Sequence, residues 1–185
     1  CEKLAPHRGS SVKPLRMLIM GVPNVGKSTI INALKNKKIA KVGNVPAVTK
    51  MQQRIEINSR MILTDTPGMM WPKITNELDG IFLAASHSIG INAYDEIETA
   101  LILSDTLKER YPELLIAYYG FTKPIPSDEE FLGHIAKARN FIIKGGKANL
   151  LKAAVTFIND YRNGVIGKIS LESPSSRKLM LDNSK

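Results

Sequence analysis

The sequence has 185 residues, a single cysteine at position 1 and a formal net charge of +9. That length is enough to bury a hydrophobic core, and a single cysteine excludes an internal disulfide framework and fits a reducing compartment. No apolar run approaches the roughly 18 residues that a membrane-spanning helix requires, so we expect no membrane span.

The charge is divided into three blocks along the chain. Residues 1–60 hold twelve Lys and Arg against two acidic residues, residues 61–136 hold four against twelve, and residues 137–178 hold nine against two. Two separated basic blocks favour an extended polyanion such as RNA. We expect no DNA partner, and we expect a monomer. Two solvated lysine-rich surfaces would have the same composition, so charge alone leaves both interpretations open.

The first half of the chain mixes strand and helix patterns. Residues 16–20 form a short apolar run that ends at a glycine, and residues 27–36 have apolar side chains at helical spacing. Two further runs, 53–57 and 61–65, flank a short polar turn, which is typical of a hairpin. A helix is expected over 76–89.

Helical patterns dominate the second half. The two-residue period disappears, and helices are expected over 95–110, 128–143 and 147–163. Asp95 is a typical N-cap residue, and Gly164 stands where a C-terminal glycine cap belongs. The chain therefore combines a mixed α/β part with an all-helical part.

The segment GVPNVGKS, residues 21–28, matches the phosphate-loop pattern G-x-x-x-x-G-K-S and lies between an expected strand and an expected helix. Its glycines allow backbone N–H groups to surround phosphates at a helix N-terminus. Lys27 then reaches the β- and γ-phosphates, and Ser28 supplies a hydroxyl to Mg²⁺. A tight turn without a ligand is the alternative interpretation.

A second element follows the strand at 61–65. Asp65 ends that strand and begins the tetrapeptide D-T-P-G, which closes at Gly68. A carboxylate at this position can hold the Mg²⁺ shell through water, and the Gly68 N–H can sense a γ-phosphate. Downstream of a phosphate loop, D-T-P-G indicates the switch of a GTPase. Thr49, in the loop between the two elements, is the candidate to cap Mg²⁺, an assignment that depends on order and spacing.

Three overlapping sets of residues make up the expected site. Nucleotide binding is assigned to Asn24, Val25, Gly26, Lys27, Ser28, Thr29 and Gly68. Catalysis is assigned to Lys27, Thr49 and Gly68. Mg²⁺ is assigned to Ser28, Thr49 and Asp65.

A GTPase reads guanine with N-K-x-D, usually after D-T-P-G, and no such tetrapeptide occurs downstream here. The segments PNVGKSTIINAL, PAVTK, DTPGMMWPK and INDYRNGVIGKISLE together resemble the YlqF/RbgA family of circularly permuted GTPases. The resemblance runs from about Val12 to Pro174. It implies guanine-reading segments before the phosphate loop, and a role in assembly of the large ribosomal subunit in bacteria or, through a related branch, in mitochondria.

Some features depart from the family pattern. Pro46-Ala47 stands where the family usually has Pro-Gly in the first switch, and His7, His87 and His134 do not match the family's catalytic histidine. The guanine-reading half has no counterpart in this sequence. We therefore expect the functional protein to contain a further N-terminal segment of about 90–120 residues. Without it, the first expected strand would be an open sheet edge.

The resemblance also suggests roles for two side chains, those of Asn24 and Met69. Asn24 resembles the asparagine that helps to hold K⁺ in GTPases with this Pro-Asn pair, although an asparagine that only satisfies its own loop is the alternative. Met69 stands where Ras-like GTPases carry a water-orienting glutamine, so we expect slow hydrolysis unless the ribosome stimulates it. Trp71 and Pro72 are expected to pack the switch loop against the helical domain.

The resemblance implies an α/β fold, part of a P-loop GTPase sheet of the permuted Ras-like kind, with a C-terminal all-helical domain. We expect a GTPase core over 1–93, a helical RNA-binding domain over 94–174 and a tail over 175–185. RNA contacts in the helical domain are assigned to Lys137, Arg139, Lys144, Lys147 and Lys152.

The leading hypothesis is a GTP-hydrolysing assembly factor for the large ribosomal subunit, which uses GTP or GDP, Mg²⁺ and K⁺ in the bacterial cytoplasm or, alternatively, the mitochondrial matrix. A second hypothesis is an RNA-binding module with an incomplete, inactive nucleotide pocket. A third is a K⁺-dependent GTPase of the tRNA-modification type, but its unpermuted order would place N-K-x-D downstream.

Overall fold

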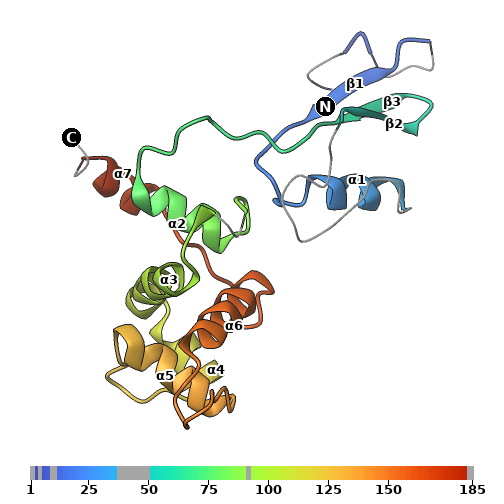
Figure 1. Cartoon of the computed structure of the whole chain (residues 1–185). Helices are drawn as coiled ribbons and strands as arrows, with labels where there is room; N and C mark the ends of the chain where they lie inside the picture. Colours follow the sequence, from blue (N-terminus) through green and yellow to red (C-terminus); the bar gives the residue numbers. More distant parts are fainter. Residues whose placement is uncertain (1–2, 4–5, 9–11, 37–50, 91–92, 183–185) are drawn as a thin grey trace. The chain divides into compact units, whose positions relative to one another are not determined.

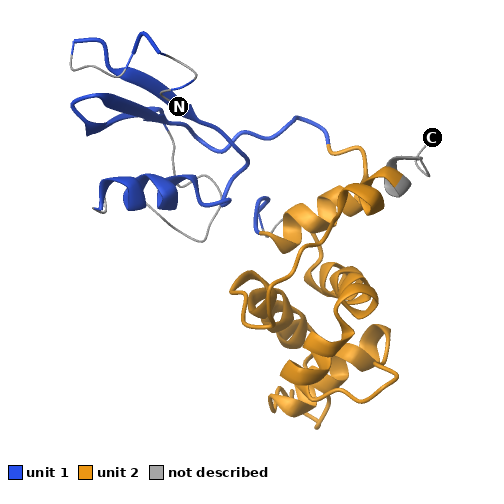
Figure 2. Ribbon diagram, turned by 180° about the vertical axis from the view of Figure 1, so that it is seen from behind, with its two compact units in different colours: residues 1–73, 87–90 blue, residues 74–86, 91–185 orange. Residues whose placement is uncertain are grey.

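The computed structural model describes residues 3, 6–8, 12–36, 51–90 and 93–182 (Figure 1). The chain forms two compact units (Figure 2). Residues 1–73 and 87–90 make up the first, which we call the sheet unit, and residues 74–86 and 91–185 make up the second, the helical unit. No helix in the described ranges is long and apolar enough to cross a membrane.

The sheet unit is built from three strands and one helix (Figure 1). β1 (Leu15–Ile19) runs parallel to β3 (Met61–Asp65), and β2 (Gln53–Asn58) pairs with β3 in the antiparallel direction, so the strand order is β1-β3-β2. Parallel strands need a crossover connection, and α1 (Lys27–Lys35) lies in it. The expected strands and first helix are confirmed within one or two residues.

The described residues of the sheet unit form a small core. Ile31 of α1 packs with Ile55 of β2 and Leu63 of β3, and all three side chains are buried. In the described part of the chain β1 pairs with β3 alone, and Leu18 on β1 and Met20 beside it are 54% and 60% exposed. β1 is therefore an edge strand with apolar side chains, a kind of edge that proteins usually cover.

Helices make up the described part of the helical unit, apart from short connections. They are α2 (Glu77–Ala85), α3 (Glu96–Arg110), α4 (Pro112–Tyr119), α5 (Asp128–Ala138), α6 (Leu150–Arg162) and α7 (Pro174–Asp182). The Asp95 side chain caps α3 by accepting the Glu98 N–H at 2.8 Å. Gly164 follows α6 with a φ of 68°, which favours glycine, so both expected caps are confirmed.

Aromatic side chains fill the centre of the helical unit. Phe121 stacks on Phe131 of α5 with ring centroids 4.8 Å apart, and Phe131 meets Phe157 of α6 edge-on at 5.0 Å. Leu103, Leu107 and other apolar residues of α3 are fully buried in the same cluster. Because α3, α5 and α6 each contribute to this cluster, apolar burial holds the three helices together.

Several helix boundaries differ from the sequence-based expectation. No helix was expected between residues 110 and 128, but α4 begins there at Pro112, which fits because the first residues of a helix need no N–H. α5 ends at Ala138 because Asn140 has a positive φ of 55°. α6 starts only at Leu150, and α2 ends at Ala85.

α2 belongs to the helical unit, although we expected it in the GTPase core. Arg162 of α6 donates to the carbonyl oxygens of Ala85 at 2.8 Å and Ala84 at 2.7 Å, where the dipole of α2 favours a cation. Arg177 of α7 pairs with Asp79 of α2, with 3.0 Å between its second nitrogen and Oδ2. Contacts at both ends of α2 thus place the division between the units at residues 73 and 74.

A buried polar network joins α4 to α6. The Tyr119 hydroxyl donates to Asp160 Oδ2 at 2.9 Å, and a guanidinium nitrogen of Arg139 lies 3.3 Å from the same oxygen. Burial, followed by the negative charge of Asp160, raises the pKa of Tyr119 above its ordinary value of about 10. The folded protein therefore keeps this hydroxyl neutral at a pH where the unfolded chain ionises it.

The substitution Tyr119→Phe tests this network. It should lower the free energy of unfolding near neutral pH by about 1–2 kcal/mol, because a hydrogen bond to a charged group is lost. Above about pH 10 the unfolded wild-type chain gains stability by ionising Tyr119, so the difference between the two proteins should shrink as the pH rises. Urea unfolding at neutral and alkaline pH measures this difference, and a constant difference would contradict the account.

Candidate nucleotide-binding site

The loop between β1 and α1 is folded around its own lysine. Gly26 directly precedes α1 with a φ of 90°, a conformation that suits glycine because it has no Cβ. Lys27 is only 8% exposed, and its Nζ donates to the carbonyl oxygens of Gly21 at 3.1 Å and Val22 at 2.8 Å. The ammonium group is therefore held within the loop beside the N-terminus of α1, where helix dipoles favour an anion.

Strand pairing brings the second expected element to this loop. Ile19, the last residue of β1, stands opposite Asp65, the last residue of β3, so both strands end at the same sheet edge. Asp65 is 1% exposed, and its Oδ2 accepts a hydrogen bond from the Ser28 hydroxyl at 3.4 Å. The Thr66 hydroxyl donates to the Ile19 carbonyl at 2.7 Å, which ties the two strand ends together.

The other carboxylate oxygen of Asp65 has no partner among the described residues. Oδ1 is buried and accepts no hydrogen bond from any residue that the structure describes. An unsatisfied buried carboxylate oxygen costs free energy, and a native site normally compensates it with a ligand, ion or water. A Mg²⁺ ion satisfies it directly or through water, and the neighbouring Ser28 hydroxyl is a suitable second ligand. The residues present therefore fit Mg²⁺.

Gly68 lies tightly against the phosphate loop. A Cβ on Gly68 would stand 2.6 Å from the Cα and 2.7 Å from the N of Pro23, so only glycine fits there. The next N–H, of Met69, donates to the Gly21 carbonyl at 3.1 Å, while the Met69 side chain is 47% exposed. The backbone of the D-T-P-G segment thus lies directly against the backbone of the phosphate loop.

A third segment braces the loop. Asn24 has a positive φ of 60°, and its side-chain nitrogen donates to the His87 carbonyl at 2.7 Å. The hydroxyl of Ser88, which is 2% exposed, donates to the Pro23 carbonyl at 3.2 Å. Sequence reasoning missed this brace, because its acceptor is a backbone carbonyl that no residue pattern marks.

Comparison with known proteins identifies the family. Residues 16–119 match the family model described as 50S ribosome-binding GTPase. Ribosome biogenesis GTPase A of Bacillus licheniformis is 38% identical over 175 residues, which cover 94% of this chain and 62% of the relative. Its counterpart from Thermotoga maritima is 33% identical over 159 residues, which cover 86% and 56%. The chain belongs to the YlqF/RbgA family. It spans about three fifths of the length of the curated relatives it matches.

Solved structures of YlqF share the fold. The GNP-bound protein from T. maritima is 28% identical with a TM-score of 0.59, and the match covers 87% of this chain and 60% of that one. A GDP-bound YlqF is 26% identical with a TM-score of 0.59, and covers 88% and 62%. The expected fold class, an α/β P-loop GTPase with a helical domain, is thereby confirmed.

The structure brings most of the expected site residues to one edge of the sheet. Those that meet there through the contacts above are Asn24, Gly26, Lys27, Ser28, Asp65 and Gly68. Val25 and Thr29 are exposed, the first in the loop and the second in the first turn of α1. Thr49 and the pair Pro46-Ala47 lie outside the described residues.

The surroundings of the three histidines do not indicate a catalytic role. His7 is exposed, and His87 braces the phosphate loop through its carbonyl. His134 places Nε2 3.0 Å from the Tyr119 carbonyl, and its ring stacks on Phe121 with centroids 4.3 Å apart. His134 therefore belongs to the packing of the helical unit.

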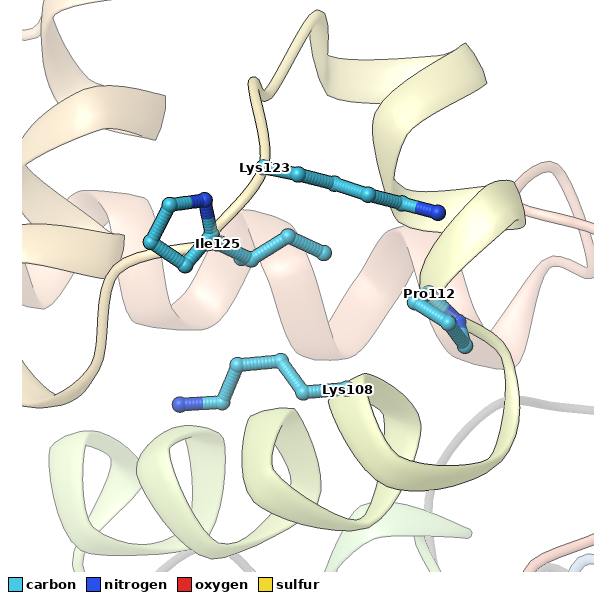
Figure 3. Close-up of a pocket in the computed structure, with 5 residues that line it drawn as sticks. Lys108, Pro112, Lys123 and Ile125 are labelled. Atoms are coloured by element: carbon cyan, nitrogen blue, oxygen red, sulfur yellow. The ribbon is translucent and has the colours of Figure 1, made fainter.

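A hollow of about 550 Å³ in the helical unit is lined by Lys108, Pro112, Lys123, Pro124 and Ile125 (Figure 3). The two lysine side chains extend in opposite directions in Figure 3. Each one pairs with a carboxylate, Lys108 with its own-helix Asp105 at 2.7 Å and Lys123 with the carboxylate of Glu113. Because a phosphate needs donors that converge, the phosphate loop is the better nucleotide site.

Gly68→Ala tests the close approach at the candidate site. The added methyl group collides with backbone atoms of Pro23, which cannot rotate away, so the D-T-P-G segment must move off the phosphate loop. We expect GTP affinity to fall at least about tenfold, as measured by titration of a fluorescent nucleotide.

Gly80→Ala is the matched control. Its added Cβ would lie 3.8 Å from Ile74 Cγ2, an ordinary contact, and alanine is favoured over glycine within α2 by about 1 kcal/mol. This variant should bind nucleotide like the wild type. Equal nucleotide affinities for Gly68→Ala and Gly80→Ala would contradict the described geometry.

Proposed function

We propose that this chain binds GTP with Mg²⁺ and hydrolyses it to GDP and phosphate as part of an assembly factor for the large ribosomal subunit. One observation carries the proposal: the buried lysine of the phosphate loop and the unpartnered oxygen of Asp65 occupy the same edge of the sheet. A nucleoside triphosphate bound with its metal ion requires a cation site beside an anion-binding loop. Membership of the YlqF/RbgA family supports guanine as the base.

Each residue has a distinct role in this proposal. Lys27 exchanges its bonds to the loop carbonyls for oxygens of the β- and γ-phosphates, while backbone N–H groups of Val25, Gly26 and Thr29 surround the phosphates. Ser28 and Asp65 would hold Mg²⁺, which would supply positive charge to neutralise the phosphate oxygens. 

The nucleotide state is read by two loops. We assign the Gly68 N–H to the γ-phosphate, since the close contact of Gly68 with Pro23 brings its backbone to the loop that holds the phosphates. Thr49 is assigned to the Mg²⁺ shell, and Asn24 to K⁺ through its amide oxygen. Met69 supplies no group that could orient water, so hydrolysis is slow until the ribosome completes the site.

RNA binding is assigned to the basic part of the helical unit. Lys137, Lys144, Lys147 and Lys152 are exposed there, whereas Arg139 is partly exposed and its guanidinium contacts Asp160 and the Tyr118 hydroxyl. Surface cations of this kind gain affinity by releasing counterions from RNA phosphates. The relatives named above are bacterial, which supports the bacterial cytoplasm as the place of action, with the mitochondrial matrix as the alternative.

Lys27→Ala tests nucleotide binding. The substitution removes the charged donor to the phosphates, so GTP affinity should fall about a hundredfold while the circular dichroism spectrum stays unchanged. Lys123→Ala removes the same charge from the helical unit and should bind GTP normally. Titration with ATP in parallel measures base selection, and an equal affinity for ATP would favour the alternative of an incomplete pocket that holds phosphates without selecting guanine.

Ribosomal stimulation is tested by GTP hydrolysis assays. The wild-type rate should rise at least about tenfold when large ribosomal subunits are added, and it should be higher in K⁺ than in Na⁺. Stimulation by small subunits alone would contradict the proposed partner. Equal rates in K⁺ and Na⁺ would remove the role proposed for Asn24.

A further inference from the structure

One arginine holds the buried C-terminal end of α2. Arg162 of α6 donates from Nε to the Ala85 carbonyl and from Nη2 to the Ala84 carbonyl. Nη2 also donates to the Tyr94 hydroxyl at 3.1 Å. Ala84 and Ala85 are fully buried, so the carbonyls at this helix end need partners within the protein. A planar guanidinium satisfies two consecutive carbonyls at once, whereas the single ammonium group of a lysine does not.

The chain passes from one unit to the other directly beyond this helix end. α2 and Ser86 belong to the helical unit, and residues 87–90 belong to the sheet unit (Figure 2). The Ser86 N–H donates to the Phe82 carbonyl at 2.9 Å, which keeps Ser86 attached to the last turn of α2. Because the chain is continuous, the direction in which His87 leaves the helical unit depends on where α2 ends.

Residues 87 and 88 in turn hold the phosphate loop. His87 and Asn24 have φ values of 62° and 60°, a left-handed conformation that is uncommon outside glycine, and the Asn24 side chain donates to the His87 carbonyl. The buried Ser88 hydroxyl donates to the Pro23 carbonyl. Conformations of this kind persist where the surrounding contacts hold them. The loop that carries Lys27 is thus braced by the two residues that follow Ser86.

We propose that Arg162 is a positioning residue for the nucleotide site: by fixing the end of α2, it holds residues 87 and 88 where they brace the phosphate loop. The inference rests on the proposed function and deepens it, because nucleotide affinity then depends on a side chain of the helical unit. Arg162 acts through the covalent chain, so the proposal requires no contact between the two units.

α2 is connected to the candidate site at both of its ends, and the two connections have different consequences. Its N-terminal side follows the D-T-P-G segment, which is assigned to the γ-phosphate that only GTP carries. Its C-terminal side leads to the brace of the phosphate loop, which is assigned in part to the β-phosphate that GTP and GDP share. Since Arg162 holds the C-terminal end, its loss should weaken GTP and GDP binding alike.

Arg162→Lys tests the proposal, since lysine retains the charge but cannot occupy both carbonyls. The affinity of the whole chain for fluorescent GTP and GDP analogues, measured by titration, should fall at least about fivefold for both nucleotides. A loss confined to GTP would show that α2 acts through the D-T-P-G segment, and would overturn the proposal. Affinities equal to those of the wild type would overturn it as well.

Arg110→Lys is the matched control. Arg110 of α3 also donates to a carbonyl of the helical unit, that of Leu171 at 3.1 Å, but it holds the segment before α7 and not the end of α2. This variant should lower the melting temperature about as much as Arg162→Lys and leave both nucleotide affinities unchanged. If it weakened nucleotide binding as much as Arg162→Lys does, the effect would be one of general stability and the positioning role would be refuted.

Ser88→Ala interrupts the same route at its other end. It should also weaken GTP and GDP binding at least about fivefold. Because both substitutions loosen one brace, the double variant should lose far less than the about 25-fold that two independent fivefold effects would give. Losses that multiply in the double variant would contradict a shared route.

Amide hydrogen exchange separates failure of this inference from failure of the proposed function. In the absence of nucleotide, exchange at residues 21–28 should be faster in Arg162→Lys than in the wild type or in Arg110→Lys. A wild-type chain that binds neither GTP nor GDP would refute the proposed function, and faster exchange of the loop in Arg162→Lys would still support the positioning role. Equal exchange of the loop in all three proteins would overturn that role.

Discussion

The parallel pairing of β1 with β3 is the constraint on which the candidate site depends. Because Ile19 stands opposite Asp65, the phosphate loop and the D-T-P-G segment leave the sheet at the same edge. A slip of one residue would turn the Asp65 side chain to the other face of the sheet and remove it from Ser28. The hydrogen bond from Thr66 to Ile19 opposes such a slip just beyond the last strand pair. The candidate metal and phosphate site thus depends on the register between β1 and β3.

The segment that follows the candidate site connects the sheet unit to the helical unit. After Gly68 the chain runs into α2, and the contacts of Arg162 and Arg177 make α2 a member of the helical unit. Ordering of the D-T-P-G loop by a γ-phosphate would therefore restrict the chain immediately before a helix that belongs to the helical unit. A ligand shifts such an equilibrium by as much as its affinity differs between the two states.

Local patterns made the phosphate loop, Asp65 and the main helices predictable, since spacing and composition determine them within a few residues. The elements that were missed depend on context. Pro112 ends one helix and opens the next, and only the tertiary fold decides between a stop and a start. Two expected helices ran to residue 143 and from residue 147, but the positive φ of Asn140 ends α5 at Ala138, and α6 begins only at Leu150. The brace at His87 uses a carbonyl, which every residue possesses.

The small core of the sheet unit has a thermodynamic consequence. Among the described residues of the sheet unit, three aliphatic side chains form the buried cluster and contribute little apolar burial, whereas the helical unit has a large aromatic and aliphatic cluster. A ligand that binds only the folded sheet unit would stabilise it by about 2.7 kcal/mol at a hundred times its Kd. That gain is large relative to the stability so small a core provides. Nucleotide would then be a structural component of the sheet unit as much as its substrate, and heating would melt the two units in separate, differently ligand-dependent transitions.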